Sequence, residues 1–171
     1  MKIIANIFGI LATIVFISSY QFKKRNLIIT CSVISRLLYV LQYVFLGAYA
    51  GIALDLIAGI ISVVAQKKDT KVIKKYFPLV VALCYISIII VGALTYNNLF
   101  TIFAILGVIF EITAFWFSSE FKIRVLSLLG APCWCAYNLK CLAYGSAIGN
   151  VITFISIIVA ILRYHVFKKE K

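Results

Sequence analysis

Long uncharged apolar segments, separated by short stretches rich in lysine and arginine, make up nearly the whole chain. Helical segments of roughly 17–22 residues are long enough to cross the hydrocarbon core of a bilayer. Seven such segments occur, at 3–20, 27–47, 51–66, 77–95, 99–117, 122–143 and 146–166. The pattern predicts an all-α membrane protein with seven transmembrane helices, and a single membrane domain over residues 1–171.

Composition supports the same class. Hydrophobic residues make up 64% and charged residues 13% of the chain, whereas soluble domains have about 45–50% and about 25%. The net charge of +12 could suit a nucleic-acid-binding protein, but the basic residues form short clusters between apolar runs, so we expect no nucleic-acid partner. The first run has no A-x-A-like cleavage site and basic residues follow it at once, which predicts a retained helix rather than a signal peptide.

The basic clusters predict the orientation of the helices. With seven helices, alternate loops lie on opposite faces of the membrane, and lysine and arginine collect on the inner face. One face receives most of the 17 basic residues: Lys23, Lys24, Arg25, Lys67, Lys68, Lys71, Lys74, Lys75, Lys122, Arg124, Arg163, Lys168, Lys169 and Lys171. We therefore expect the N-terminus outside and the C-terminus inside, with the inner basic loops attracting anionic lipid headgroups.

Two pairs of short motifs suggest an internal repeat. "FGILA" at 8–12 and "FAILG" at 103–107 are 95 residues apart, while "GAYAG" at 47–51 and "GSAIG" at 145–149 are 98 apart, as are Tyr39 and Tyr137. The pairs predict two three-helix copies, at 3–66 and 99–166, separated by a connector helix at 77–95. Because one helix separates the copies, both have the same orientation, which is a parallel 3+1+3 repeat.

This plan resembles that of the SWEET-like (PQ-loop-like) superfamily of sugar transporters and related vitamin-precursor carriers. More specifically, the chain is similar to the YgjV-type family of bacterial inner-membrane proteins over nearly its whole length, in "QFKKRNLIITCSVIS" with "LGAY" (21–49), in "CWCAYN" with "YGSAIGN" (133–150) and in Arg163. The resemblance implies a multi-pass protein of the bacterial inner (cytoplasmic) membrane. The Pro-Gln pair found in many relatives is absent from this sequence. The resemblance therefore does not imply that both copies gate symmetrically in this chain.

The segment "APCWCAYN" at 131–138 combines a proline with two cysteines inside one apolar run. On a helix, Cys133 and Cys135 lie about 200° apart, so they cannot bind one metal ion or bond to each other. We expect the cysteines to act as small hydrophobic residues and expect no metal site or cofactor. Pro132 removes the N–H that would bond the carbonyl of Leu128, which predicts either a functional hinge or a kink that serves packing alone.

In SWEET-like carriers a tryptophan on the middle helix and an asparagine on the third helix line the substrate cavity, and Trp134 and Asn150 resemble that pair. An indole face covers the apolar side of a small ring, and an amide offers donors and an acceptor. Asn138, four residues after Trp134, shares its face. The alternative is that Trp134 faces lipid and the asparagines join helices. The repeat predicts Arg36 and Ile52 at the equivalent positions of the first copy.

Arg36 is the most unusual residue, since a charge at the bilayer centre costs about 2.5–3.5 kcal/mol or more unless it is paired. At about 1.5 Å per residue, Arg36 lies roughly 16 Å and Glu111 roughly 18 Å below the outer surface, so the two can pair, whereas Asp55 is the second choice at about 6–8 Å. The pair is either a structural clamp or a working site that binds solute or a proton. Tyr39 and Gln42 add hydrogen-bonding groups on the same helix.

With one histidine and five acidic residues, and no catalytic or phosphate-binding motif, the chain is not expected to be an enzyme. The sequence predicts a transporter of a small polar solute, such as a sugar or a vitamin-like molecule, by alternating access. Facilitated and proton-coupled transport both remain open, as does a homo-oligomer. The alternative is a membrane receptor or accessory protein of the same fold that transports nothing.

Overall fold

The chain is described over residues 2–166 by a computed structural model, in which that range forms helices joined by short loops and contains no strand. The elements are α1 (Lys2–Ser19), α2 (Arg25–Leu46), α3 (Tyr49–Gln66), α4 (Lys71–Lys75), α5 (Phe77–Leu94), α6 (Phe100–Trp116), α7 (Glu120–Lys140), α8 (Tyr144–Ile161) and the π-helical turn η1 (Leu162–Val166). Each predicted apolar segment coincides with one of the seven long helices. The short α4, within the basic segment 67–75, was not predicted. Lys168, Lys169 and Lys171 lie outside the described residues.

Five of these helices are long and apolar enough to cross a membrane, namely α1, α2, α3, α5 and α8 with its extension to Tyr164. The helix α6 is strongly apolar but has only 17 residues. The helix α7 has 21 residues and carries charged side chains in its first and last turns. The molecule is therefore an all-helical membrane protein with five clear candidate spans.

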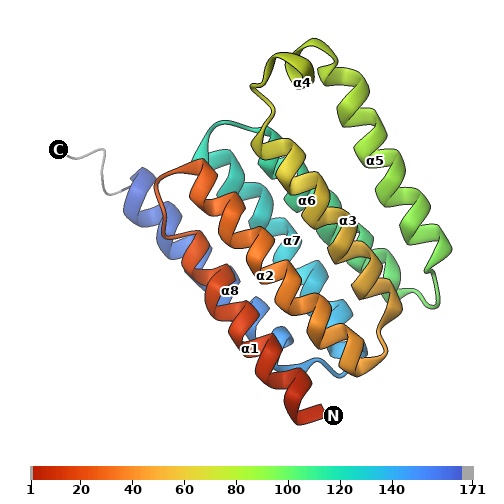
Figure 1. The fold of residues 1–171 in the computed structure, drawn as a ribbon. Helices are drawn as coiled ribbons and strands as arrows, with labels where there is room; N and C mark the ends of the chain where they lie inside the picture. The colour runs from red at the N-terminus through yellow and green to blue at the C-terminus, as the bar shows by residue number, and fades with distance from the viewer. Residues whose placement is uncertain (1, 167–171) are drawn as a thin grey trace.

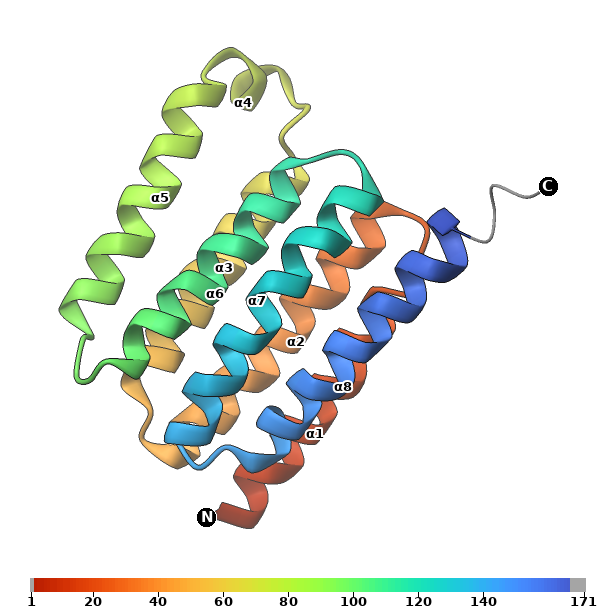
Figure 2. The ribbon, with the colours of Figure 1, turned by 180° about the vertical axis from the view of Figure 1, so that it is seen from behind.

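The long helices form two layers. Figure 1 shows α1, α2 and α3 side by side in one layer, and Figure 2, seen from behind, shows α6, α7 and α8 in the other. The layers meet at both edges, where α1 packs against α8 and α3 packs against α6. The helix α5 lies outside this pair of layers and packs against α3 and α6. The space between the two layers therefore forms the interior of the bundle.

Two tight turns connect neighbouring antiparallel helices within the layers. Gly47 has a left-handed φ of 66°, which lets the Ala48 N–H donate to the Tyr43 carbonyl at 3.0 Å and close the end of α2. The turn between α7 and α8 has the same form, with Leu142 at φ 59° and the Ala143 N–H donating to the Asn138 carbonyl at 2.9 Å. Each turn brings the next helix directly back beside the previous one.

The second and third helices of the two layers share one offset. The helices α2 and α7 begin at 25 and 120, and α3 and α8 run from 49 to 66 and from 144 to 161, so the offset is 95 for these pairs, whereas α1 and α6 begin at 2 and 100. The offset of 98 predicted from "GAYAG" and "GSAIG" is wrong for these helices. Gly47 lies in the turn before α3, whereas Gly145 lies within the first turn of α8, so the two motifs occupy different places.

The single offset also changes which positions correspond. The predicted counterparts of Trp134 and Asn150, at Arg36 and Ile52, lie three residues too early. An offset of 95 pairs Trp134 with Tyr39 and Asn150 with Asp55.

Candidate functional site

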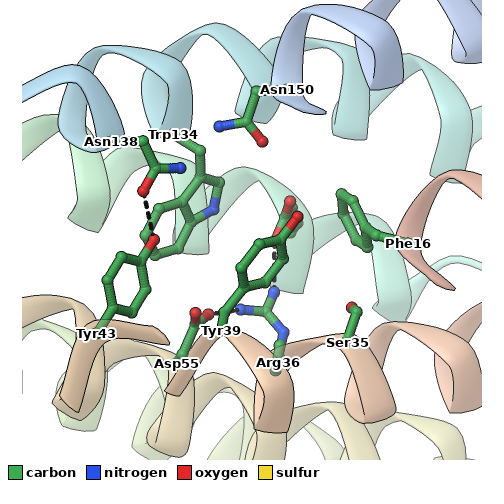
Figure 3. A pocket seen from close by; sticks show the side chains of 10 residues that line it. Phe16, Ser35, Arg36, Tyr39, Tyr43, Asp55, Trp134, Asn138 and Asn150 are labelled. Carbon is green, nitrogen blue, oxygen red and sulfur yellow. Dashed lines mark hydrogen bonds and ion pairs between the residues drawn. The ribbon is translucent and has the colours of Figure 1, made fainter. Parts of the chain in front are cut away.

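Polar and aromatic side chains from both layers face one small cavity at the centre of the bundle (Figure 3). It encloses about 20 Å³, which is room for about one water molecule. Its lining consists of Phe16, Ser35, Arg36, Tyr39, Tyr43, Asp55, Glu111, Trp134, Asn138 and Asn150. The three charged side chains in this list are each only 3% exposed. The cavity is therefore a buried polar site at the centre of the bundle.

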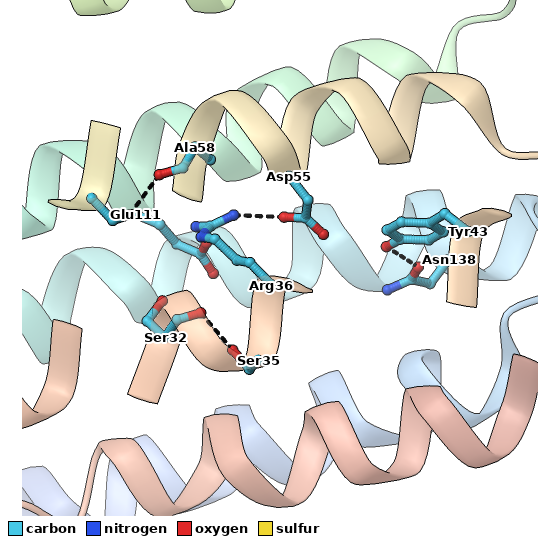
Figure 4. A network of polar contacts seen from close by, with 9 residues as sticks. Ser32, Ser35, Arg36, Tyr43, Asp55, Ala58, Glu111 and Asn138 are labelled. Atoms are coloured by element: carbon cyan, nitrogen blue, oxygen red, sulfur yellow. Dashed lines mark hydrogen bonds and ion pairs between the residues drawn. The ribbon is translucent and has the colours of Figure 1, made fainter. Parts of the chain in front are cut away.

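Arg36 is the centre of an ionic triad in this cavity (Figure 4). Its Nη1 donates to Asp55 Oδ1 of α3 at 2.6 Å, and its Nη2 donates to Glu111 Oε2 of α6. Both predicted partners therefore contact Arg36 at once, one within its own layer and one across the layers. Ion pairs that join residues within 2–166 are limited to these two.

The position of each side chain on α2 follows from helical spacing. Tyr39 and Tyr43 lie three and seven residues after Arg36, on the same face, and both line the cavity. Gln42 lies six residues after Arg36, about 240° around the axis, and does not line the cavity. It packs instead against Gly9 of α1 and accepts a hydrogen bond from Ser146 of α8. Gln42 was predicted to contribute to solute binding, and the structure places it outside this cavity.

Hydrogen bonds fix the aromatic side chains of the site. The Tyr43 hydroxyl donates to Asn138 Oδ1 at 2.7 Å, joining α2 to α7 across the layers. The Tyr39 hydroxyl lies 3.1 Å from the hydroxyl of Thr13 on α1. The Tyr43 ring also meets the Tyr137 ring edge to face, with centroids 6.0 Å apart. Tyr43 was not among the predicted site residues, although its spacing from Arg36 places it on the same face.

Two glycines allow α6 and α7 to approach closely beside the cavity. A Cβ atom on Gly107 would lie 2.9 Å from Cδ1 and Nε1 of Trp134, and one on Gly130 would lie 3.2 Å from Cγ of Glu111. The absence of side chains at these glycines therefore leaves the space that Trp134 and Glu111 occupy. Trp134 is buried rather than facing lipid.

Two buried hydrogen-bond donors of the lining have no partner among the described residues. They are Nε of Arg36 and Nδ2 of Asn150. Buried polar groups in proteins are nearly always paired with protein or water, so an unpaired donor in a cavity points to a missing acceptor. The site is therefore able to accept a molecule that presents oxygen acceptors.

Pro132 and the cysteines lie outside this cavity. Pro132 is inside the continuous helix α7 and lines a separate apolar groove of about 400 Å³ between α7 and α8. Cys133 Sγ points to the Leu129 carbonyl of its own helix, whereas Cys135 Sγ points to the Ala147 carbonyl of α8. The two thiols thus face different ways, and no cluster of three or more potential metal ligands occurs in the described part of the chain.

At the end of the bundle that carries the basic loops, two arginines join the layers through backbone carbonyls. Arg25, at the start of α2, donates to the carbonyls of Ala65, Phe115 and Phe117 at 2.6, 2.7 and 2.9 Å. Arg124, on α7, donates to the carbonyls of Tyr20 and Phe22 at 3.3 and 3.0 Å. The acceptors Tyr20 and Phe115, like Phe22 and Phe117, are 95 residues apart. Burial and the neighbouring Arg25 lower the pKa of Lys68, which donates to the Trp116 carbonyl at this end.

The sequence matches a known family of membrane proteins. Residues 3–168 match the model of the family Imp-YgjV, described as bacterial inner membrane protein. The match covers the helices α2 to α8 and all of α1 except its first residue, and so includes the whole lining of the cavity. No curated protein and no solved structure matches the chain.

Proposed function

The chain belongs to the Imp-YgjV family of bacterial inner membrane proteins, and on that premise we propose that it transports a small polar solute by alternating access. The observation that carries this proposal is the closed central cavity, which polar side chains from both layers line. Polar and charged groups within a membrane bundle are costly and mark functional sites by default. As a multi-pass protein of the inner membrane, the chain is placed to move a solute across it.

The architecture in this proposal is a parallel repeat of two three-helix units, 3–66 and 99–166, with the connector 77–95 and seven membrane spans. Four pairs of cavity residues lie 95 positions apart, which supports the repeat: Phe16 and Glu111, Tyr39 and Trp134, Tyr43 and Asn138, and Asp55 and Asn150. Repeat-built carriers bind solute at the interface between their repeats. A cavity lined by corresponding positions of both copies has that location.

The proposed orientation places the N-terminus outside and the end with the basic loops in the cytoplasm. The loop before α2, the segment around α4 and the loop before α7 all lie at the same end of the bundle (Figure 1). Gathering of lysine and arginine at one end supports this orientation through the positive-inside rule. The same loops would bind anionic lipid headgroups.

The chemistry of the lining favours a solute rich in oxygen acceptors. The unpaired donors on Arg36 and Asn150 suit hydroxyl or carbonyl oxygens. The Trp134 indole offers an apolar face to a ring. Sugars and vitamin-like molecules combine these two features.

The rival function is a receptor or accessory protein that transports nothing. A cavity of about 20 Å³ is too small for a sugar, so transport requires the two layers to separate. An accessory protein would keep this site closed and use the triad only to fix the packing of the layers. Binding of a solute at the cavity discriminates between the two functions.

The chain contains two tryptophans, and this allows a direct binding experiment. Trp134 lines the cavity, whereas Trp116 lies at the end of α6 against the ring of Phe77. The variant Trp116→Phe therefore leaves one tryptophan, at the site. The fluorescence of this variant would be recorded while sugars, nucleosides, vitamins and organic acids are added. Thermal unfolding would be measured on the same samples.

We expect one class of solute to change the Trp134 emission and to raise the unfolding temperature, because a ligand that binds only the folded state stabilises it. The change in unfolding temperature should be absent in Asn150→Leu and present in Trp116→Phe. If no solute alters either signal in a folded sample, the transport proposal fails and the accessory function is favoured.

A further inference from the structure

The charges of the central triad do not balance. Arg36 carries one positive charge, while the carboxyls of Asp55 and Glu111 carry two negative charges when both are ionised. All three side chains are almost completely buried. An uncompensated charge in such surroundings is very unfavourable, and a buried group normally becomes neutral instead. The triad therefore needs one further positive charge.

No other described side chain supplies that charge. The titratable groups near enough to interact electrostatically with the triad are Tyr20 directly after α1, Tyr39 and Tyr43 on α2, and Cys133 and Tyr137 on α7, while the described residues of α8 contribute none. Phenol and thiol groups are neutral at physiological pH in their ordinary state. The remaining described lysines and arginines lie in loops or near helix ends.

From this imbalance we infer that the Asp55–Arg36–Glu111 triad is a proton-binding site that holds one exchangeable proton. The proton adds to a carboxylate oxygen of Asp55 or Glu111 and converts that anion into a carboxylic acid. The other carboxylate and the guanidinium then form a neutral pair. No partner or chemical group other than a proton from water is required for this step.

A proton fits the geometry better than a metal ion does. The cavity has space for about one water molecule, whereas sodium and similar ions need several oxygen ligands around them. The unpaired polar atoms of the lining are the donors Arg36 Nε and Asn150 Nδ2, and N–H donors repel a cation. The carboxyl groups are therefore the groups of the lining that bind the added positive charge.

The location of the proton affects how the layers are joined. Asp55 and Arg36 belong to the same layer, but Glu111 belongs to the other and forms the ion pair with Arg36 that crosses between them. A proton on Glu111 weakens this link, whereas a proton on Asp55 leaves it intact. If the transport function proposed above holds, proton binding at the triad couples solute movement to the proton gradient.

The test is infrared difference spectroscopy of the full-length protein in lipid nanodiscs between mildly acidic and mildly alkaline pH. A carboxylic acid gives a C=O band that a carboxylate lacks. We expect the wild type to show a band from one buried acid that persists at neutral pH. The controls Asp69→Asn and Glu120→Gln, which change carboxyls outside the cavity lining, should retain it. Asp55→Asn and Glu111→Gln should each lose it, because Arg36 then pairs with the one remaining carboxylate.

Absence of the band from the wild type at neutral pH overturns the inference, and this result needs no variant to fold. So does a band that appears only when sodium is replaced by choline, since sodium would then be the balancing charge. Persistence of the band in both Asp55→Asn and Glu111→Gln also overturns it. A band that is present in a protein that binds no solute leaves the proton site intact and contradicts the transport function alone.

Discussion

Replacing Arg36 with methionine tests whether the buried charges of the triad hold the two layers together. Methionine is unbranched, has a similar volume and carries no charge, so the change removes the guanidinium while filling much of its space. Asp55 and Glu111 then lose the cation that each contacts in the closed cavity. The variant therefore leaves the ionised carboxylate of the triad buried without a counter-charge.

The size of the effect follows from this geometry. Removing one partner of a buried ion pair costs about 3–5 kcal/mol. For a soluble chain of this length, 1 kcal/mol corresponds to about 2–4 °C in unfolding temperature. We therefore expect Arg36→Met to unfold about 6–20 °C below the wild type in thermal scans of the detergent-solubilised protein.

A triple variant distinguishes the effect of losing a charge from the effect of changing side-chain volume. The triple variant Arg36→Met, Asp55→Asn, Glu111→Gln removes all three charges and changes the volume little. Replacing a whole buried ionic group in this way is often neutral or stabilising, so most of the lost stability should return. If Arg36→Met unfolds within about 3 °C of the wild type, the loss is smaller than the shift derived above, and the buried charges do not hold the layers together. A triple variant as unstable as the single variant would lead to the same conclusion. A stable triple variant that has lost solute binding would identify the triad as a working site rather than a clamp.

Further substitutions probe the packing around the site. Gly107→Ala places a Cβ atom 2.9 Å from the Trp134 ring. The resulting overpacking should lower the free energy of unfolding by about 1–3 kcal/mol, which thermal unfolding measures. The control is Gly59→Ala, because nothing lies within 4 Å of a Cβ atom at that position. Equal stability of the two variants would contradict the close approach of α6 and α7. Arg124→Gln should lower stability by about 1.5–3 kcal/mol, since hydrogen bonds from a charged donor are lost, whereas Lys122→Gln at an exposed position should have little effect.

The helices could be predicted from the sequence because each is a long and predominantly apolar run. The register between the two layers could not, because glycines in similar motifs serve different purposes. Gly47 supplies a left-handed turn, and the corresponding turn of the second layer uses Leu142. A comparison based on glycine motifs therefore aligned Gly47 with Gly145 and gave an offset three residues too long.

The site was predicted in part, and its errors have physical causes. Depth along the helix axis favoured Glu111 over Asp55 as the partner of Arg36, but the two guanidinium nitrogens of a long side chain contact both. Gln42 was included because it is polar, although its angular position turns it toward α1 and α8. Applying the 100° helical rotation from Arg36 excludes Gln42 and selects Tyr43.

The clamp and the working site differ in whether the bond from Arg36 to Glu111 persists in every state of the protein. In a carrier that opens, this ion pair between the layers must be broken or replaced. Breaking it unaided at about 4 kcal/mol would reduce the open population roughly a thousandfold, since each 1.4 kcal/mol is a factor of ten. A proton on Glu111 removes one of the two charges, and a solute oxygen can accept from the guanidinium, so either lowers this cost. In the carrier proposed above, the triad would therefore allow ready opening only when the site is occupied, which is the condition that prevents a coupled carrier from opening empty.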